Sequence, residues 1–161
     1  MVGATPAPPL EPLLHQLFSA ALLRGTFTLR SGATSDRYFD KYRVTGDPVL
    51  LAPIAEWLTS AVREHAPEAT RIIAPALGAV PLATALALQS GLPFAIVRDA
   101  SKGYGTNSRI EGTTISGEQT VLVEDVVTSG SAALEALEAA REAGLVVTRA
   151  LCVLDRDGGG R

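Results

Sequence analysis

The chain has very little cysteine and histidine: one Cys152, together with His15 and His65, in 161 residues. A single cysteine cannot form an internal disulfide framework, and no group of Cys and His has the spacing of a zinc site. Cys152 lies in an apolar run and is expected to be a small core residue. His15 falls in a predicted helix and His65 near the end of another, where contact with helix carbonyls explains them without catalysis. Neither structural zinc nor a disulfide-stapled secreted fold is expected.

The chain also lacks an excess of positive charge. It has 14 basic against 17 acidic side chains, a formal charge of -3 and an isoelectric point near 5.4. Binding to a phosphate backbone requires clustered cations that displace counterions. Nucleic acid is therefore not predicted as a partner.

No leader peptide or membrane span is predicted. Residues 1–12 contain four prolines and no basic residue ahead of an apolar block, and we expect a disordered, proline-rich arm there. Residues 72–97 carry no charge, but prolines and glycines divide them into short buried elements. We therefore expect a cytoplasmic protein with no membrane partner. The dividing residues are Pro75, Gly78, Pro81, Gly91 and Pro93.

The hydrophobic pattern predicts an α/β fold. Helical spacing of apolar residues predicts helices over 13–24, 48–63, 81–89 and 132–143. Short β-rich runs predict strands over 26–29, 38–44, 71–74, 94–97, 120–123 and 146–154. From residue 71 onward strands and helices alternate, which favours a central, mainly parallel sheet flanked by helices. Residues 13–161 are long enough for one domain with a substantial core.

One polar segment follows the strand predicted at 120–123. Glu124 and Asp125 come first, and a small hydroxyl-rich turn, residues 127–131, then opens a helix. Free amides and the helix dipole favour a phosphate at such a turn. Two adjacent carboxylates would repel that phosphate, and they suit sugar hydroxyls or a metal ion. The alternative is a solvated strand end followed by an ordinary helix cap.

Two further segments follow predicted strands. Residues 98–112 form a polar, glycine-punctuated loop whose cations, Arg98 and Lys102, could neutralise a departing pyrophosphate; an ordinary solvated loop is the alternative. Residues 74–81 form a compact turn in which the backbone could approach an anion closely, unless it is a plain strand-to-helix turn. Carboxyl ends of parallel strands meet at one edge of a sheet, so these segments are expected to form one site.

Residues 121–132 resemble the signature with which type I phosphoribosyltransferases bind 5-phosphoribosyl 1-pyrophosphate (PRPP). The resemblance implies the type I phosphoribosyltransferase fold, with Glu124 and Asp125 at the ribose hydroxyls and residues 127–131 at the 5-phosphate. It implies a catalytic set of Lys102, Asp125 and Glu124. The PRPP-binding residues that it implies are Ala76, Leu77, Gly78, Arg98, Lys102, Tyr104, Glu124, Asp125, Val126, Val127, Thr128, Ser129, Gly130 and Ser131.

Three other segments are similar to orotate phosphoribosyltransferases. Residues 98–112 resemble the catalytic loop of that family, which reaches into the neighbouring subunit. Residues 27–41 resemble its small N-terminal hood, expected over about 13–45 beside a PRPP-binding core over about 46–161. Leu154-Asp155-Arg156 resembles a signature whose arginine meets the orotate carboxylate, as a planar guanidinium can. The implied orotate-binding residues are Arg30, Tyr38, Phe39, Thr128 and Arg156.

Each of these assignments has a structural alternative. Tyr38 and Phe39 could be packing residues of a hairpin, and Arg156 could form a surface ion pair with Asp155 or Asp157. The chain also departs from the family in two places. Tyr104 stands where many members have a histidine, and a phenol with a pKa of about 10 carries no positive charge near neutrality. Residues 74–81 lack the lysine that some members carry there.

The resemblance implies transfer of ribose 5-phosphate from PRPP to orotate in pyrimidine (UMP) biosynthesis. It implies PRPP and orotate as small-molecule substrates, Mg²⁺ bound mainly through PRPP and near Asp125, and a homodimer in which the 98–112 loop is donated to the neighbouring site. Two alternatives stay open at this point. One is a phosphoribosyltransferase for another nucleobase, and the other is a non-catalytic, PRPP-sensing regulatory module.

Overall fold

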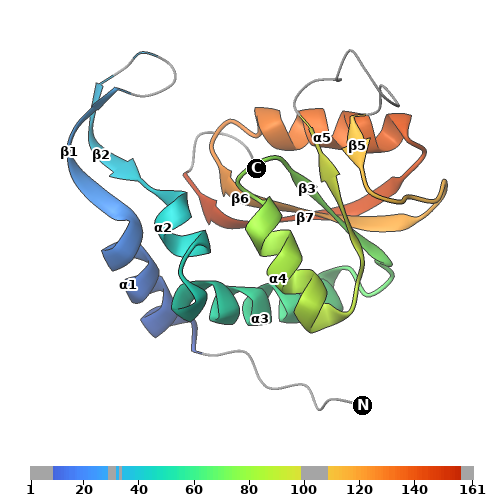
Figure 1. Ribbon diagram of the computed structural model, residues 1–161, viewed down its shortest axis with the longest axis horizontal. Helices are drawn as coiled ribbons and strands as arrows, with labels where there is room; N and C mark the ends of the chain where they lie inside the picture. Colours follow the sequence, from blue (N-terminus) through green and yellow to red (C-terminus); the bar gives the residue numbers. More distant parts are fainter. Residues whose placement is uncertain (1–8, 29–31, 33, 99–108, 157–161) are drawn as a thin grey trace.

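The structure, a computed structural model, describes residues 9–28, 32, 34–98 and 109–156. An N-terminal part, the hood, is followed by a core built around a twisted sheet (Figure 1). The hood comprises α1 (Leu10–Ala21), β1 (Leu22–Thr28), β2 (Thr34–Phe39) and α2 (Lys41–Thr45). The core comprises α3 (Pro48–His65), β3 (Arg71–Pro75), α4 (Val80–Ser90), β4 (Phe94–Val97), β5 (Ile110–Glu111), β6 (Gln119–Val127), α5 (Ser131–Glu142) and β7 (Val146–Asp155).

The core sheet has the strand order β5-β4-β3-β6-β7. Strands β4, β3, β6 and β7 are parallel to one another, and β5 runs antiparallel to β4. All five residues of β3 are buried, as expected for a strand with helices over both of its faces. The predicted α/β fold with a mainly parallel sheet is confirmed.

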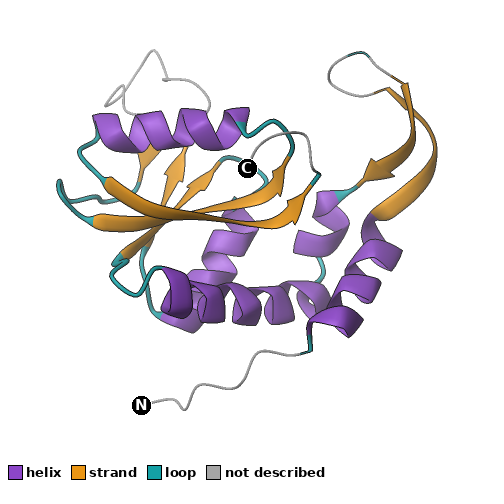
Figure 2. Cartoon of the chain, turned by 180° about the vertical axis from the view of Figure 1, so that it is seen from behind, coloured by secondary structure: helices purple, strands orange, loops and turns teal. Residues whose placement is uncertain are grey.

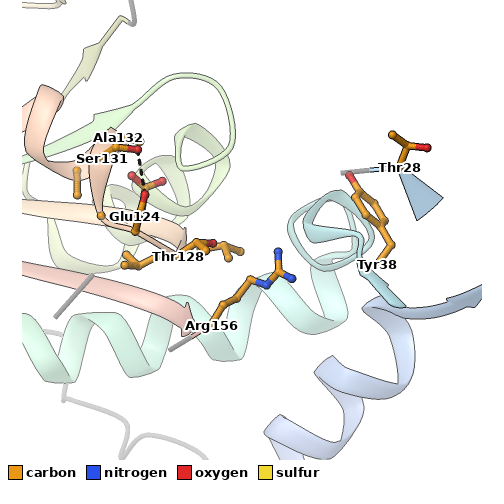
Figure 3. Close-up of a pocket in the computed structure, with 12 residues that line it drawn as sticks. Thr28, Tyr38, Glu124, Thr128, Ser131, Ala132 and Arg156 are labelled. Carbon is orange, nitrogen blue, oxygen red and sulfur yellow. Dashed lines mark hydrogen bonds between the residues drawn. The ribbon is translucent and has the colours of Figure 1, made fainter. Parts of the chain in front are cut away.

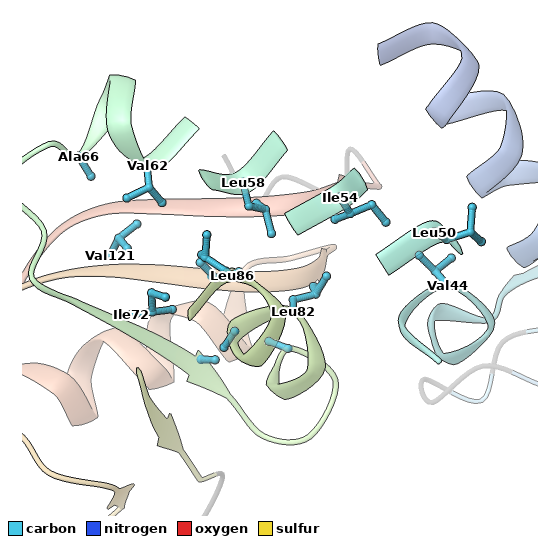
Figure 4. Packing of buried hydrophobic residues seen from close by; sticks show 14 of the residues in the cluster. Val44, Leu50, Ile54, Leu58, Val62, Ala66, Ile72, Leu82, Leu86 and Val121 are labelled. Carbon is cyan, nitrogen blue, oxygen red and sulfur yellow. The ribbon is translucent and has the colours of Figure 1, made fainter. Parts of the chain in front are cut away.

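Alternate residues of the central strands enter two separate layers of the core. Ile72, Val121 and Val123 face α3 and α4, and their cluster extends to Leu58, Leu82 and Leu86 (Figure 4). Ile73 and Leu122 face the opposite way and pack with Ala136, Ala139 and Ala140 of α5. Figure 2 shows α5 on one side of the sheet and α3 and α4 on the other. This burial holds β3 and β6 side by side in parallel, with residues 71–73 paired to residues 120–122.

The hood is attached to the core through its helices. In α1, Leu13 and Leu17 belong to the same cluster as Ile54 and Leu58 of α3. The β1–β2 hairpin has no fully buried residue among its described positions, and it stands away from the core sheet (Figure 1). The hairpin therefore presents most of its side chains to solvent beside the carboxyl end of the sheet.

Three predicted boundaries in the hood are wrong. The first helix begins at Leu10 rather than at residue 13. A proline is tolerated in the first turn of a helix, because an amide at that position would have no acceptor within the helix. Residues 22–24 pair with β2 as a strand instead of ending that helix. The strand predicted over 38–44 stops at Phe39, because the Asp40 carboxylate accepts a hydrogen bond from the Tyr42 amide and so caps α2. Residues 1–8 of the predicted arm lie outside the described residues.

Two expectations for the core also need correction. Strand β6 continues through Glu124 and Asp125 to Val127, because it keeps pairing with β7 along this length. Cys152 is exposed rather than buried, since it lies on β7, which pairs with β6 alone among the described strands. Within the described residues, no helix is long and apolar enough to cross a bilayer. The charge-free stretch at 72–97 forms β3, α4 and β4.

Candidate active site

A cavity of about 710 Å³ lies between the carboxyl end of the sheet and the hood. The residues around it come from distant parts of the sequence, as Figure 3 shows for Tyr38, Glu124 and Arg156. Its lining consists of Thr28, Tyr38, Glu124, Val126, Val127, Thr128, Ser129, Gly130, Ser131, Ala132, Ala133 and Arg156. The structure thus brings the predicted phosphate-binding turn together with residues of the hood and of the β7 end.

The turn between β6 and α5 forms one wall of this cavity. Gly130 precedes the helix with a φ of 79°, in the left-handed region that glycine adopts readily. No side chain caps α5, and the hydroxyl of Ser129 lies 3.3 Å from that of Ser131. The first amides of a helix have no partner within the helix, so this turn offers uncapped donors to an anion.

Glu124 lines the cavity and is only 6% exposed. Its Oε2 atom has no hydrogen-bond partner among the described residues. Burial, with a hydrogen bond and repulsion from Asp125, raises the pKa of Glu124 to about 8. A protonated or newly ionised Glu124 could accept a hydrogen bond from a sugar hydroxyl, because one of its oxygens is unused.

Asp125 does not line the same cavity, since successive side chains of a strand point to opposite faces. It is 4% exposed, and its Oδ2 atom lies 2.7 Å from the Lys41 ammonium. The Val126 amide donates to its Oδ1 atom over 2.6 Å. A side chain at Gly78 would collide with both the Asp125 carboxylate and the Lys41 ammonium. The turn after β3 therefore lies directly against Asp125.

The predicted pyrophosphate turn is held in place from β4. The Ala76 amide donates to the Val97 carbonyl over 2.7 Å, and Leu77 is largely exposed. None of Ala76, Leu77 and Gly78 lines the main cavity. These residues approach the site from the Asp125 side of β6 and lie opposite the turn that begins α5.

The hood contributes Tyr38 but not Phe39 to the cavity. The Tyr38 ring stacks on Phe27 of β1 with centroids 5.5 Å apart, and Tyr38 and Thr28 line the cavity. Phe39 turns the other way and meets Phe18 of α1 edge-on at 6.1 Å. The two aromatic residues predicted to cover a base thus have different surroundings, and Phe39 packs against the core.

Arg156 follows β7 directly, and its amide donates to the Val127 carbonyl over 2.9 Å. Figure 3 shows its side chain extending from the end of β7 toward the hood. Arg98, by contrast, forms an ion pair with Glu111 at 3.4 Å and is not among the cavity residues. Arg30, Lys102 and Tyr104 lie outside the described residues.

Lys41 is the residue of the site that sequence reasoning missed. Lys41 falls in the hood segment, where the local pattern assigns it no role because its partner Asp125 is distant in the sequence. The clue in the sequence was the scarcity of lysine, since Lys41 and Lys102 are the only two.

Within the described part of the chain, no group of three metal-ligating side chains occurs.

Comparisons with known proteins agree with this geometry. The family model for the phosphoribosyl transferase domain matches residues 45–160. The fold and the site together thus define a phosphoribosyltransferase.

The relatives narrow this class further. An orotate phosphoribosyltransferase of Halobacterium salinarum is 46% identical over 137 residues, which is 85% of this chain and 76% of that protein. The crystal structure of orotate phosphoribosyltransferase from Aeropyrum pernix superposes with a TM-score of 0.81 at 34% identity and covers 91% of this chain and 84% of that one. A Mycobacterium tuberculosis orotate phosphoribosyltransferase in complex with PRPP has a TM-score of 0.76 at 28% identity, with 92% and 84% covered. This chain belongs to the orotate phosphoribosyltransferase family.

Proposed function

We propose that this chain transfers the 5-phosphoribosyl group of PRPP to N1 of orotate, in the biosynthesis of UMP. The bond between C1 of the ribose and the pyrophosphate oxygen breaks, a bond from C1 to N1 of orotate forms, and the proton of N1 is released to solvent. The products are orotidine 5′-monophosphate and pyrophosphate. The observation that carries the proposal is the cavity itself, which has an uncapped helix start and a buried carboxylate at one end and Tyr38 and Arg156 at the other.

The roles of the residues follow from their chemistry. The amides of residues 128–131 bind the 5-phosphate, and Glu124 and Asp125 accept hydrogen bonds from the ribose hydroxyls. Positive charge develops on the ribose ring as the leaving group departs, and the same two carboxylates stabilise it. No covalent intermediate with the protein is needed.

Orotate is recognised at the hood end of the cavity. The Tyr38 ring, backed by Phe27, offers an aromatic face to the planar base. The Arg156 guanidinium can bind the orotate carboxylate through two parallel hydrogen bonds. Thr128 lies between the two ends and contacts both substrates, and Arg30 is the remaining residue proposed at the base. A guanidinium at this position favours orotate over adenine or guanine, which lack a carboxylate.

Mg²⁺ fits this site as a partner of PRPP. Asp125 and Glu124 are the acidic groups at the site, and the unused oxygen of Glu124 suits a hydroxyl donor or a cation. The ion would neutralise charge on the pyrophosphate oxygens when bound. Lys102 is proposed to add a second positive charge from the 98–112 loop. That loop is proposed to come from the partner subunit of a homodimer in the cytoplasm.

A spectroscopic assay tests the proposal. Orotate absorbance should fall when PRPP and Mg²⁺ are added, and adenine or guanine should not be consumed. Replacing Arg156 by Gln should raise the KM for orotate by about ten- to a hundredfold, because a charged bidentate contact is lost. Arg149→Gln, at the other end of β7, is the matched control and should behave like the wild type. Turnover of a purine instead of orotate would contradict the proposal, and PRPP binding without turnover would favour a sensing module.

The same assay tests the loop cation. Lys102→Ala should lower kcat, since the leaving pyrophosphate loses a neutralising charge. Full velocity in this variant would refute the role of Lys102 while leaving the orotate assignment intact.

A further inference from the structure

Lys41 is held at the junction between the hood and the core. It is the first residue of α2, and the Asp40 carboxylate fixes the start of this helix by accepting from the Tyr42 amide over 3.2 Å. Arg43 adds an ion pair to Asp40 at 3.4 Å. The Lys41 backbone is therefore anchored, and its side chain reaches from the hood to the end of β6.

The Lys41 ammonium lies at one place with two other parts of the site. Its Nζ atom is 2.7 Å from Asp125 Oδ2, and the space above Gly78 is bounded by these same two groups. Asp125 is nearly inaccessible, whereas the Lys41 side chain is 36% exposed. The ammonium is thus held by a buried carboxylate, while the Lys41 side chain as a whole keeps part of its surface exposed to solvent.

The charge on Lys41 is stable in these surroundings. Burial lowers the pKa of Lys41, but the hydrogen bond and the attraction to Asp125 outweigh it, so the pKa is raised above its ordinary value. An ammonium has three N–H donors, and Asp125 is its only ion-pair partner within the described ranges. Donors therefore remain for an anion.

The turn at residues 77–78 offers further donors beside this ammonium. Among the described residues, the amides of Leu77 and Gly78 have no backbone acceptor, while those of Ala76 and Val80 are bonded. Gly78 has no side chain to cover them. The Lys41 cation thus lies directly against a turn with uncapped amides, on the side of β6 away from the 5-phosphate turn.

We propose that Lys41 is a pyrophosphate-binding residue of this enzyme, and that it supplies from the hood the cation that the 74–81 turn lacks. This inference rests on the proposed function, because the anion is the pyrophosphate group of PRPP. Asp125 holds the ammonium in place, so besides its proposed contact with the ribose it orients a cation toward the leaving group.

The test distinguishes binding of the pyrophosphate group of PRPP from binding of its ribose 5-phosphate part. Binding of Mg²⁺–PRPP, Mg²⁺–pyrophosphate and ribose 5-phosphate is measured by calorimetry for the wild type, Lys41→Met and Lys41→Gln. Loss of one charged contact should weaken PRPP and pyrophosphate binding by about ten- to a hundredfold in both variants. Ribose 5-phosphate, which lacks the pyrophosphate, should bind as it does to the wild type. Pyrophosphate should also become a weaker product inhibitor, while the KM for orotate is unchanged.

Two further variants and one further measurement complete the experiment. Lys41→Arg should restore part of the pyrophosphate affinity, and Arg37→Met, which removes an exposed hood cation, should change none of the three affinities. Thermal unfolding is followed for each protein, and Lys41→Gln decides the matter if Lys41→Met fails to fold, because Gln can still donate to Asp125. Equal losses for PRPP and ribose 5-phosphate, or no loss for either, would overturn the proposal. A wild type that binds none of the three ligands would instead refute the proposed function.

Discussion

Acidic side chains lie at both ends of the β3–β6 strand pair, and their partners and pKa values differ between the two ends. At the amino end, Glu118 meets Arg71 at 2.8 Å and also accepts from the Ile115 amide at 3.2 Å. The hydrogen bond from Arg71 lowers the pKa of Glu118. At the carboxyl end, burial raises the pKa of Glu124 to about 8, and one of its oxygens has no described partner.

The difference separates a structural acid from functional ones. Glu118 has a cation and hydrogen-bond donors around its ionised carboxylate, and its ion pair with Arg71 links β3 to the segment before β6. Glu124 and Asp125 are adjacent, buried and served by one described lysine, an arrangement that costs stability unless a ligand completes it. Unsatisfied polar groups at one end of a well-packed sheet are typical of a binding site.

The largest expected effect is at the carboxyl end. Asp125→Asn should lower kcat/KM for PRPP by about 10²- to 10³-fold, because the site loses charge that stabilises the ribose and orients Lys41. The melting temperature should change little, since the partly exposed Lys41 loses its partner while the neighbouring Glu124 is relieved of a repelling charge. Steady-state kinetics and thermal unfolding check both parts. Asp36→Asn, an equivalent change on the exposed hairpin, is the control, and wild-type activity in Asp125→Asn would contradict the comparison.

The amino end should give the opposite pattern. Glu118→Ala should lower the free energy of unfolding by about 2 kcal/mol, because Arg71 and the Ile115 amide lose their acceptor. The KM for PRPP should be unchanged in the folded variant. Chemical denaturation measures the loss, with the exposed Glu64→Ala as the control. If the Glu118→Ala protein were as stable as the wild type but bound PRPP more weakly, the amino end would be functional and the structural assignment of Glu118 would be wrong.

Glu124 should also produce a pH dependence of the stability. Its pKa is about 8 in the folded chain and near 4.5 when unfolded, so the folded state binds the extra proton between these values. The free energy of unfolding therefore falls as pH rises through this window. Denaturation at several pH values, compared with Glu124→Gln, isolates the contribution. The slope should be flatter in Glu124→Gln, and identical slopes would show that Glu124 is ionised throughout.

The sequence could predict the phosphate end of the site because that end is local. Residues 120–131 are contiguous, and an apolar strand followed by acids, hydroxyls and a helix start already defines their arrangement. The same holds for the parallel sheet, since the alternation from residue 71 onward leaves few other topologies. The family resemblance extended this prediction to the fold and to the orotate family, and the comparisons confirm both.

The remaining features depend on contacts between distant residues. The β-rich composition of residues 38–44 favours a strand, but the Asp40 side chain captures the Tyr42 amide and begins α2. Phe39 turns toward Phe18, which no local pattern around Phe39 indicates. The Lys41–Asp125 ion pair joins the hood to β6, and it forms only once α2 has packed against the core.

A crystal structure of the protein with PRPP and Mg²⁺ tests the central claim most directly. The 5-phosphate should lie on the amides of residues 128–131, with the ribose hydroxyls on Glu124 and Asp125. PRPP bound elsewhere, with this turn empty and both acids unengaged, would contradict the account.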